Sequence, residues 1–404
     1  MIIGIIGAGA SGIAAAVEAS KNENVQVILW ERQARVGRKL AATGNGRCNL
    51  TNMNARWGSG FFYGTSPEFA DKALIHYSAD ETRHWFLTMG LYTVAEESGR
   101  VYPFSDQANS VVDVLRFALD KPNIRLLCGR EVRKISKKDG VFVVTDSEES
   151  IRCDKLIVAC GGIAGSKLGG SMSGYQLLRS MGHHCTKLRP SLVQIKCDWN
   201  GCVSLKGVRT NCWVSILRNG NLFAQSRGEL QFTEYGLSGP GIFEISSDVC
   251  SDKADWICSL DFLPGFDDED LEYELMRRKG TNLLSDELLT GILHNRLGRV
   301  ISKEAGVKSG VPIKDIPDYL LREVSRMVKQ FDIRLTEPMG MDSAQVTAGG
   351  ICTAEFCTDT MESNLVSGLY ACGEVLDIDG RCGGFNLQWA WSSGRLAGYC
   401  AGKE

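Results

Sequence analysis

The chain opens with Ile2-Ile3-Gly4-Ile5-Ile6-Gly7-Ala8-Gly9-Ala10-Ser11-Gly12, an apolar run that leads into a glycine-rich turn. We expect a buried strand at Ile2–Ile6, an alanine-rich helix at Ala10–Ser20 and a second buried strand at Val25–Trp30. In the G-x-G-x-x-G spacing, the first glycine permits a tight turn, the second lets the backbone approach a pyrophosphate, and the third allows close helix–strand packing. The pattern therefore predicts a dinucleotide-binding βαβ unit.

The position of Glu31 supports this interpretation, because it lies 24 residues after Gly7 at the end of the second strand. Its carboxylate can accept hydrogen bonds from ribose hydroxyls, and its charge would repel a 2′-phosphate. The helix that follows the glycines offers free N–H groups and a positive dipole end to a phosphate. The alternative is a glycine turn in an unrelated α/β fold.

The C-terminal region distinguishes FAD from NAD. Gly368–Glu374 is expected to be a strand that enters a glycine turn, and Gly383-Gly384 precedes a last helix at Leu387–Ala401. A second helix N-terminus in the same domain suits the pyrimidine end of a flavin, where negative charge develops on reduction. An ordinary packing helix would explain the apolar residues but not the paired glycines.

Composition limits the classes of protein to consider. The chain has 404 residues, 44% hydrophobic and 23% charged, which is typical of a globular protein and excludes a disordered chain, a coiled coil or a collagen. Its 45 Lys/Arg and 48 Asp/Glu give a net charge of −3. This net charge lacks the basic excess that is typical of general nucleic-acid binding. The 15 cysteines contain no C-x-x-C, so we interpret them as reduced thiols in a reducing cytosol and predict no metal site.

The uncharged opening segment lacks a basic n-region and contains four glycines, which argues against a signal peptide or a membrane helix. We therefore expect a cytoplasmic protein without a membrane partner. The oligomeric state stays open.

The pattern changes along the chain. Residues 66–120 are predicted to be mainly helical, and residues 124–158 to form short strands. Short strands separated by turn residues follow from about residue 190, a helical pattern covers about 268–330, and strands with glycine turns return at 344–404. We predict an α/β fold whose Rossmann-type FAD-binding domain, similar to the FAD half of glutathione reductase, comprises residues 1–190 and 336–404. A β-barrel-like insert at 191–265 and a helical insert at 266–335 would interrupt it.

Five sequence blocks resemble one known family over essentially the whole chain. They are Gly37–Asn52, Gly99–Ser105, Phe232–Pro240, Val346–Gly350 and Gly373–Gly394. The family is that of the NAD(P)/FAD-dependent oxidoreductases called aminoacetone-oxidase-like, which include a bile-acid-inducible flavoprotein of gut anaerobes. The resemblance implies an FAD domain with a barrel-like and a helical insert, in which the 37–52 segment wraps the pyrophosphate and flavin.

Two departures from that family concern segments expected near the active site. No proline lies between residues 161 and 175, where the family has one, and Phe232-Thr233-Glu234 replaces the family's Phe-Thr-His.

Candidate site residues follow from these motifs. Arg47, Tyr102 and Glu234 are the catalytic candidates, with Tyr235 a further proton-transfer candidate; Glu234 is expected in an apolar setting or, alternatively, as a cap of the following turn. Cys48 is either a packing residue or a redox participant. The predicted cofactor-binding residues are Gly7, Gly9, Ala10, Ser11, Gly12, Glu31, Arg32, Arg38, Lys39, Thr43, Gly44, Asn45, Gly46, Arg47, Cys48, Asn49, Val132, Ala159, Cys160, Gly161, Gly373, Glu374, Gly384, Phe385, Asn386, Leu387 and Gln388.

The function predicted from the sequence is an FAD-dependent oxidoreductase that acts on a small organic molecule, an amine, ketone or enone, by hydride transfer through the flavin. NAD(P)H or O2 is an open choice of second substrate, although no second strand–GxGxxG–helix unit indicates a dedicated NAD(P)H domain. One alternative is a flavoprotein acting on RNA, motivated by a local charge of 12 − 7 = +5 over residues 275–334 and by a basic cluster, Arg125, Arg130, Arg133, Lys134, Lys137 and Lys138. The absence of an RNA-binding motif disfavours it, and we expect no nucleic-acid partner. The other alternative is a redox sensor without turnover, which the polar 37–52 segment disfavours.

Overall fold

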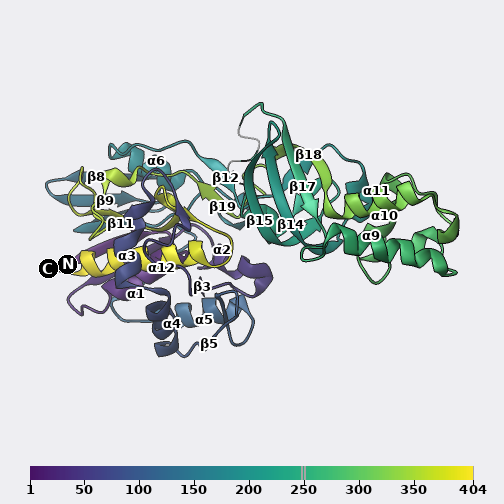
Figure 1. Ribbon diagram of the computed structural model, residues 1–404. Helices are drawn as coiled ribbons and strands as arrows, with labels where there is room; N and C mark the ends of the chain where they lie inside the picture. The colour runs from purple at the N-terminus through teal and green to yellow at the C-terminus, as the bar shows by residue number, and fades with distance from the viewer. Residues whose placement is uncertain (247–248, 250–251, 404) are drawn as a thin grey trace. The chain divides into compact units, whose positions relative to one another are not determined.

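The computed structural model describes all residues except 247, 248, 250, 251 and 404 (Figure 1). The chain forms two compact units, which are described separately. Unit 1 comprises residues 1–190 and 344–404, and unit 2 comprises residues 191–343.

Unit 1 is built on a five-stranded parallel sheet in the order β20-β11-β1-β2-β7. Its strands are β1 (Ile2–Ile6), β2 (Gln26–Glu31), β7 (Ile124–Cys128), β11 (Lys155–Val158) and β20 (Leu369–Ala371). In the central strand, Ile5 lies opposite Leu29 of β2 and Ile157 of β11, and all three are fully buried. Parallel strands covered on both faces are apolar throughout, which is why these runs were recognisable in the sequence. The predicted Rossmann-type sheet is confirmed.

Smaller sheets and helices surround this sheet. The antiparallel sheets are β3-β6-β5, β8-β9-β10 and β4-β21. The strands are β3 (Thr51–Asn52), β4 (Phe62–Tyr63), β5 (Thr93–Ala95), β6 (Arg100–Pro103), β8 (Lys134–Lys138), β9 (Val141–Thr145), β10 (Ser150–Cys153), β12 (Arg189–Ser191), β19 (Val346–Ala348) and β21 (Asp379–Gly380). The helices are α1 (Ala10–Ala19), α2 (Arg38–Ala41), α3 (Ala70–His76), α4 (Ala79–Thr88), α5 (Ala108–Ala118), α6 (Ser173–Ser180) and α12 (Phe385–Gly402).

The region predicted to be mainly helical, residues 66–120, is interrupted by the hairpin β5–β6. Gly99, at φ +82°, donates its N–H to the carbonyl of Glu96 at 2.9 Å, and this local turn reverses the chain between the two strands. The prediction missed a hairpin specified by turn geometry rather than by hydrophobic periodicity.

Helices α1 and α12 pack unusually closely. Glycines recur every fourth residue along α12, and a Cβ at Gly394 or Gly398 would lie 2.3 Å from the carbonyl oxygen of Ser11 or 2.2 Å from that of Ala15. Both contact residues advance in the same chain direction, so the helices run parallel and their N-termini point the same way (Figure 1). The third residue of the row, Gly402, lies against Ala19.

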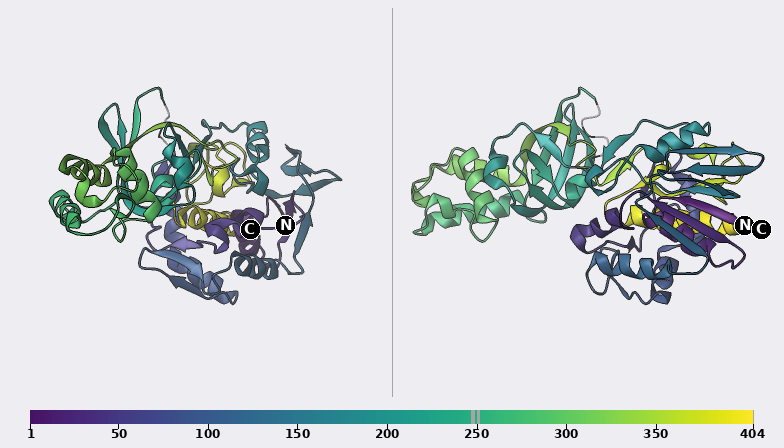
Figure 2. Two further views of the ribbon diagram at one scale, coloured as in Figure 1. Left: turned by 90° about the vertical axis from the view of Figure 1, so that its right-hand side faces the viewer. Right: turned by 180° about the vertical axis from the view of Figure 1, so that it is seen from behind.

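Unit 2 is a closed antiparallel barrel with helices beyond one end of it (Figure 2). The barrel order is β13-β16-β15-β14-β17-β18. The strands are β13 (Ile195–Cys197), β14 (Arg209–Arg218), β15 (Asn221–Phe232), β16 (Gly236–Ser238), β17 (Trp256–Asp261) and β18 (Phe331–Pro338), and the helices are α7 (Gly201–Leu205), α8 (Pro240–Phe243), α9 (Asp268–Arg277), α10 (Asn295–Glu304) and α11 (Asp318–Lys329).

The barrel and helical inserts are both present, but their boundaries differ from the prediction. Strand β18 closes the barrel by pairing with β17 and β13, so the predicted boundary at 335/336 cuts through a strand. Helical residues such as Leu275 and Leu321 share one hydrophobic core with barrel residues such as Phe331. Closure needs a partner for each edge strand, and the strand that supplies it follows the helices in the sequence.

Within the described residues, no helix combines the length and the apolar character that crossing a membrane requires.

Candidate functional site

The glycine turn after β1 has the three local environments that its spacing predicted. A Cβ at Gly7 (φ +104°) would lie 2.5 Å from the carbonyl oxygen of Ala159, and one at Gly12 would lie 1.8 Å from that of Gly7. A Cβ at Gly9, in contrast, would meet nothing within 4 Å. The outer glycines are therefore required by the protein's own packing, whereas the middle one faces open space.

Glu31 is held beside this turn by two backbone N–H groups. Its Oε2 accepts the N–H of Ala8 at 3.0 Å, and its Oε1 accepts the N–H of Gln33 at 2.7 Å. Each carboxylate oxygen has more than one acceptor site, so both retain capacity for a further donor. The arrangement orients the carboxylate toward the mouth of the glycine turn.

Two helix N-termini open on the same side of unit 1. Neither the N-cap Gly9 of α1 nor the N-cap Gly384 of α12 makes a side-chain capping bond, and neither first turn holds an acidic residue. Gly394 packs on Ser11, so α12 extends past the start of α1 by (394 − 385) − (11 − 10) = 8 residues, or ~12 Å at 1.5 Å per residue. The unit thus presents two separated positive dipole ends to one elongated, negatively charged molecule.

Helix α12 also holds the second glycine turn. The N–H of Gly373 donates to Ser393 Oγ at 3.0 Å, and its carbonyl accepts Trp389 Nε1 at 3.1 Å. Gly373 has φ +76°, and a Cβ there would lie 2.4 Å from Ser11 Oγ. Among the residues predicted around this helix start, Asn386 caps the β21 turn by exchanging hydrogen bonds with Gly380 at 2.7 and 2.9 Å.

The segment 37–52 coils tightly instead of crossing the surface as an extended loop. Gly37 donates its N–H to the carbonyl of Ala8 at 2.9 Å, which ties the start of the segment to the first glycine turn. Gly44, Asn45, Gly46 and Cys48 all have φ between +55° and +87°. Left-handed backbone is costly for residues with side chains, and at Asn45 and Cys48 the coil requires it.

An ion pair links this segment to the second glycine turn. Lys39 Nζ lies 2.9 Å from Glu374 Oε2, and Glu374 Oε1 accepts the N–H of Thr347 at 2.8 Å. Thr347 Oγ1 in turn accepts the N–H groups of Ile163 and Ala164, both at 3.0 Å. Thr347 lies in the Val346–Gly350 block but had no predicted role. Its hydrogen bonds connect the residues that follow β11 to the Lys39–Glu374 ion pair.

Arg47 and Tyr102, both predicted as catalytic, come together. The guanidinium carbon of Arg47 lies 4.1 Å from the centroid of the Tyr102 ring, and Arg47 Nε is 2.6 Å from Asp106 Oδ1. Tyr102 is buried, and this burial raises the pKa of its phenol, which stays protonated at neutral pH. The pair combines a cation with a protonated hydroxyl, two groups that stabilise an oxyanion.

Asn49 supplies the most direct sign of a ligand-binding site. Its Oδ1 is buried and has no hydrogen-bond partner among the described residues. A Cβ at Gly384 would lie only 2.9 Å from that oxygen, so the amide sits at the start of α12. Buried acceptors are normally satisfied, and an N–H donor such as that of a flavin ring would satisfy this one.

Taken with the open space at Gly9 and the uncapped helix ends, the donor set fits FAD. The residues that would hold it are Gly9 and the first turn of α1, Glu31, the 37–52 segment, and the first turn of α12. When bound, FAD supplies two-electron transfer as hydride.

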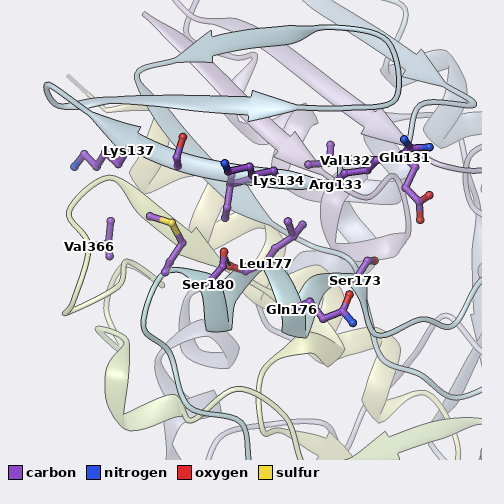
Figure 3. Close-up of a pocket in the computed structure, with 13 residues that line it drawn as sticks. Glu131, Val132, Arg133, Lys134, Lys137, Ser173, Gln176, Leu177, Ser180 and Val366 are labelled. Atoms are coloured by element: carbon purple, nitrogen blue, oxygen red, sulfur yellow. Dashed lines mark hydrogen bonds between the residues drawn. The ribbon is translucent and has the colours of Figure 1, made fainter.

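A groove of about 800 Å³ lies between β8 and α6 (Figure 3). Val132, predicted to bind the cofactor, lines it at the end shared with Glu131 and Ser173, and Lys137 and Val366 lie at the other end. The Val132 end adjoins the predicted site, because Arg130 donates its N–H to the carbonyl of Glu31 at 3.0 Å.

The remaining predicted residues have packing or anchoring contacts. Arg32 donates to the carbonyl of Gly169 at 2.8 Å, Arg38 donates to Gln33 Oε1 at 2.8 Å, and Thr43 Oγ1 donates to the carbonyl of Leu40 at 2.7 Å. Ala159 donates its N–H to the carbonyl of Ile6 at 2.8 Å and is followed by Cys160 and Gly161. The structure leaves the cofactor role of these residues as a prediction.

Two candidates are interior side chains. Gln388 is fully buried, and its Nε2 donates to Tyr77 O, Thr82 Oγ1 and Ser392 Oγ. Cys48 is fully buried, and burial raises the pKa of its thiol to about 12. A thiol that is neither ionised nor accessible is a poor redox group, so the structure favours the packing interpretation of Cys48.

Glu234 does not have the predicted apolar setting. Its side chain is 57% exposed and pairs with Lys206 at 2.6 Å within unit 2. The alternative role, capping the next turn, belongs instead to Thr233, whose Oγ1 accepts the N–H of Gly236 at 3.1 Å. Two polar residues are adjacent at this turn, and the sequence pattern does not distinguish which of them caps it.

The fold and this site define the class: an FAD-dependent oxidoreductase with a Rossmann-type FAD domain. The model of the HI0933-like protein Rossmann domain family matches residues 1–400, and the chain belongs to this family.

Curated relatives extend over the whole chain. It is 37% identical over 415 residues to a 3-dehydro-bile acid delta(4,6)-reductase of Clostridium scindens, covering 100% of this chain and 99% of the relative. It is 29% identical to the ribosomal RNA dihydrouridine synthase of Escherichia coli, covering 96% of this chain and 95% of that one. The fold is similar to that of the 3-ketosteroid delta1-dehydrogenase of Sterolibacterium denitrificans, with a TM-score of 0.50, 10% identity and 99% coverage of both chains.

Proposed function

We propose that this flavoenzyme reduces a carbon–carbon double bond conjugated to a carbonyl group in a small organic molecule. The observation that carries the proposal is the 37% identity, over the full length of both chains, to a reductase of 3-dehydro-bile acids. The name of the second relative indicates the same type of reaction, because dihydrouridine is uridine in which the ring double bond, conjugated to a carbonyl, has been reduced. Of the three substrate classes predicted, the proposal thus selects the enone.

Such a reduction makes two demands on the protein. Hydride adds to the carbon remote from the carbonyl, so negative charge develops on the carbonyl oxygen, and a proton must then reach the adjacent carbon. Tyr102 is the proposed acid, because a phenol held protonated by burial can donate a hydrogen bond or a proton. Arg47 is the proposed companion group: its guanidinium lies against the Tyr102 ring, and its charge, shared with Asp106 at 2.6 Å and Glu96 at 3.5 Å, supports the oxyanion less than an unpaired cation would. Glu234, exposed and paired with Lys206, is no longer a preferred acid.

The RNA alternative has one observation in its favour, the 29% identity to a ribosomal RNA dihydrouridine synthase. Only part of the basic charge is neutralised within the chain, because Arg133, Lys134, Lys137 and Lys138 form no ion pair with a carboxylate among the described residues. Arg130, a member of the predicted basic cluster, is buried and pairs with Asp146 at 2.7 Å, and Arg125 pairs with Glu149 at 3.3 Å. In the helical segment, Arg278 pairs with Glu274 and Lys279 with Asp318. Charges neutralised by neighbouring carboxylates contribute little to phosphate binding.

An anaerobic reoxidation assay tests the proposal. The purified holoenzyme is reduced with dithionite and mixed with a 3-oxo-4-ene steroid, 2-cyclohexenone, uridine or ribosomal RNA, while the oxidised enzyme is mixed with primary amines. We expect an enone to restore the absorbance of the oxidised flavin. Reoxidation by RNA alone, or bleaching by amines with no response to any enone, would refute it.

Tyr102→Phe identifies the acid. Loss of a general acid slows a step by about 10²–10⁴-fold; the enone reaction should slow by that factor, while reduction by dithionite should be unchanged. Glu234→Gln is the matched control, and we expect a change of less than about threefold because that carboxylate is exposed and ion-paired.

A further inference from the structure

Two cysteines that are five residues apart in the sequence lie side by side in unit 2. Cys197 ends strand β13, and Cys202 lies in the short helix α7. Their sulfur atoms are 3.3 Å apart. A disulfide needs an S–S distance of ~2.05 Å, so the two sulfurs would each move by less than an ångström to bond.

The chain between them is folded tightly enough to hold this arrangement. The pairing of β13 with β18 shifts register between Ile195 and Cys197, and such an irregularity re-aims the side chain that follows it. The ring of Trp199 then lies over Gly201, where a Cβ would be 2.1 Å from Trp199 Cζ2. Cys202 donates its N–H to the carbonyl of Trp199, which closes the turn.

The two thiols differ in environment. Cys197 is half-buried, whereas Cys202 is only 1% exposed and belongs to the barrel core. The hydrogen bond between them lowers the pKa of Cys197, and the same bond together with burial raises the pKa of Cys202. The less buried residue of the pair is therefore the one that ionises more readily, and the sulfur of the buried Cys202 lies 3.3 Å from it.

We propose that Cys197 and Cys202 form a reversible dithiol–disulfide site that reacts with hydrogen peroxide. The Cys197 thiolate attacks one peroxide oxygen, the O–O bond breaks, and a sulfenic acid and hydroxide result. The Cys202 sulfur then attacks the sulfenic sulfur, the S–O bond breaks, and water leaves with the Cys202 proton. Two thiols and one peroxide thus give one disulfide and two waters, and a dithiol reductant reverses the reaction.

Other cysteines of the same barrel serve as internal controls. Cys212 and Cys258 are fully buried, and burial raises the pKa of Cys212 to about 12 and that of Cys258 well above its usual value. Cys202 is buried too, but it lies beside the sulfur of Cys197, whereas Cys212 and Cys258 have no hydrogen-bonded sulfur among the described residues, so they are expected to stay as thiols under conditions that oxidise the Cys197–Cys202 pair.

The sequence makes the test direct. Trypsin cleaves after Lys196 and Lys206, so one peptide, Cys197–Lys206, contains both cysteines and Trp199 and no other cysteine. The full-length holoenzyme is reduced, freed of reductant and treated with hydrogen peroxide at neutral pH. Its free thiols are then blocked with N-ethylmaleimide, the protein is digested with trypsin, and the mass of the peptide is measured by mass spectrometry.

We expect this peptide to become two hydrogen masses lighter and unlabelled after peroxide, and to carry two labels when dithiothreitol is added before blocking. The Cys202→Ser variant should instead accumulate a sulfenic acid on Cys197 that dimedone traps, and Cys212→Ser should behave as the unaltered protein. A peptide that keeps two labels after peroxide, gains oxygen without cross-linking, or links to a different cysteine would overturn the proposal. Because the decisive measurement uses the unaltered protein, it does not depend on the variants folding.

Discussion

Gly9 and Gly12 belong to the same glycine motif, yet the structure predicts opposite consequences for replacing them by alanine. Gly9 has φ −84° and ψ −166°, a backbone conformation open to any residue, and its added Cβ would meet nothing within 4 Å. The apo protein should therefore tolerate Gly9→Ala with a change in unfolding free energy within about 0.5 kcal/mol.

The cofactor should not tolerate it. The new methyl group would occupy the open space above the turn, where a pyrophosphate would meet the backbone N–H groups. A hydrogen bond to a charged group is worth about 1.5–3 kcal/mol, so losing one should weaken FAD binding by roughly 10–150-fold. Gly9→Val should weaken it further.

Gly12→Ala is the matched control. Its Cβ would lie 1.8 Å from the carbonyl oxygen of Gly7, so the backbone must move, at a cost of about 1–3 kcal/mol or more in the apo protein. FAD titration of deflavinated protein and thermal unfolding of the same samples measure both quantities. Wild-type FAD affinity in Gly9→Ala, or equal destabilisation of the apo protein by both alanine substitutions, would refute the reasoning.

Three further predictions concern the cofactor carboxylate, the helix packing and a buried ion pair. Glu31→Ala should weaken FAD by about 1–3 kcal/mol in the same titration, with the loss absent for an analogue that lacks the ribose hydroxyls; equal loss for that analogue would contradict the assigned partner. Gly398→Val should separate α12 from α1, since a Cβ there would lie 2.2 Å from Ala15 O, and it should lower both thermal stability and FAD affinity; Gly280→Val, at a position without a left-handed φ where a Cβ would meet nothing within 4 Å, should leave FAD affinity unchanged. Burial opposes ionisation of Asp146, but hydrogen bonds from Arg130, Trp30 and the backbone N–H groups of residues 148 and 149 outweigh it and hold the pKa of Asp146 below its usual value. The stabilisation from this carboxylate should thus be complete above the unfolded pKa of about 3.9 and be lost as pH falls below it. Asp146→Asn should cost about 1–3 kcal/mol in urea unfolding at pH 7, because it removes the buried charged partner of Arg130, which keeps Glu148 at 2.8 Å and Glu149 at 3.0 Å; an unchanged stability would argue against the pair.

The parts of the site that the sequence predicted well are specified by short stretches of chain. The strand at Ile2–Ile6 needs apolar residues because both faces of a parallel sheet are covered. Gly7 has φ +104°, a conformation that favours glycine, and Gly12 is required by a contact with the carbonyl of Gly7, five residues earlier, so the spacing of the two glycines is informative. The position of Glu31 at the end of the second strand could be predicted because the length of a βαβ unit varies little.

Residues outside such local patterns were placed less well. The expected apolar setting of Glu234 was wrong, because exposure depends on how the neighbouring strands pack and on the presence of Lys206. The predicted boundary at 335/336 divided β18 between the helical insert and the FAD-binding domain, because the barrel partners that identify this strand lie before the helices in the sequence. Thr347 went unassigned, since its hydroxyl serves N–H groups about 180 residues away.

The sequence by itself therefore determined the Rossmann-type domain, its FAD turn and the presence of two inserts, because these depend on hydrophobic periodicity and on conformations that only glycine adopts readily. Tertiary structure alone decided which side chains meet: Arg47 with Tyr102, Arg130 with Asp146, and Cys197 with Cys202. The physical reason is that a backbone conformation is set by a few adjacent residues, whereas the contact, burial and pKa of a side chain depend on segments that only the completed packing brings together.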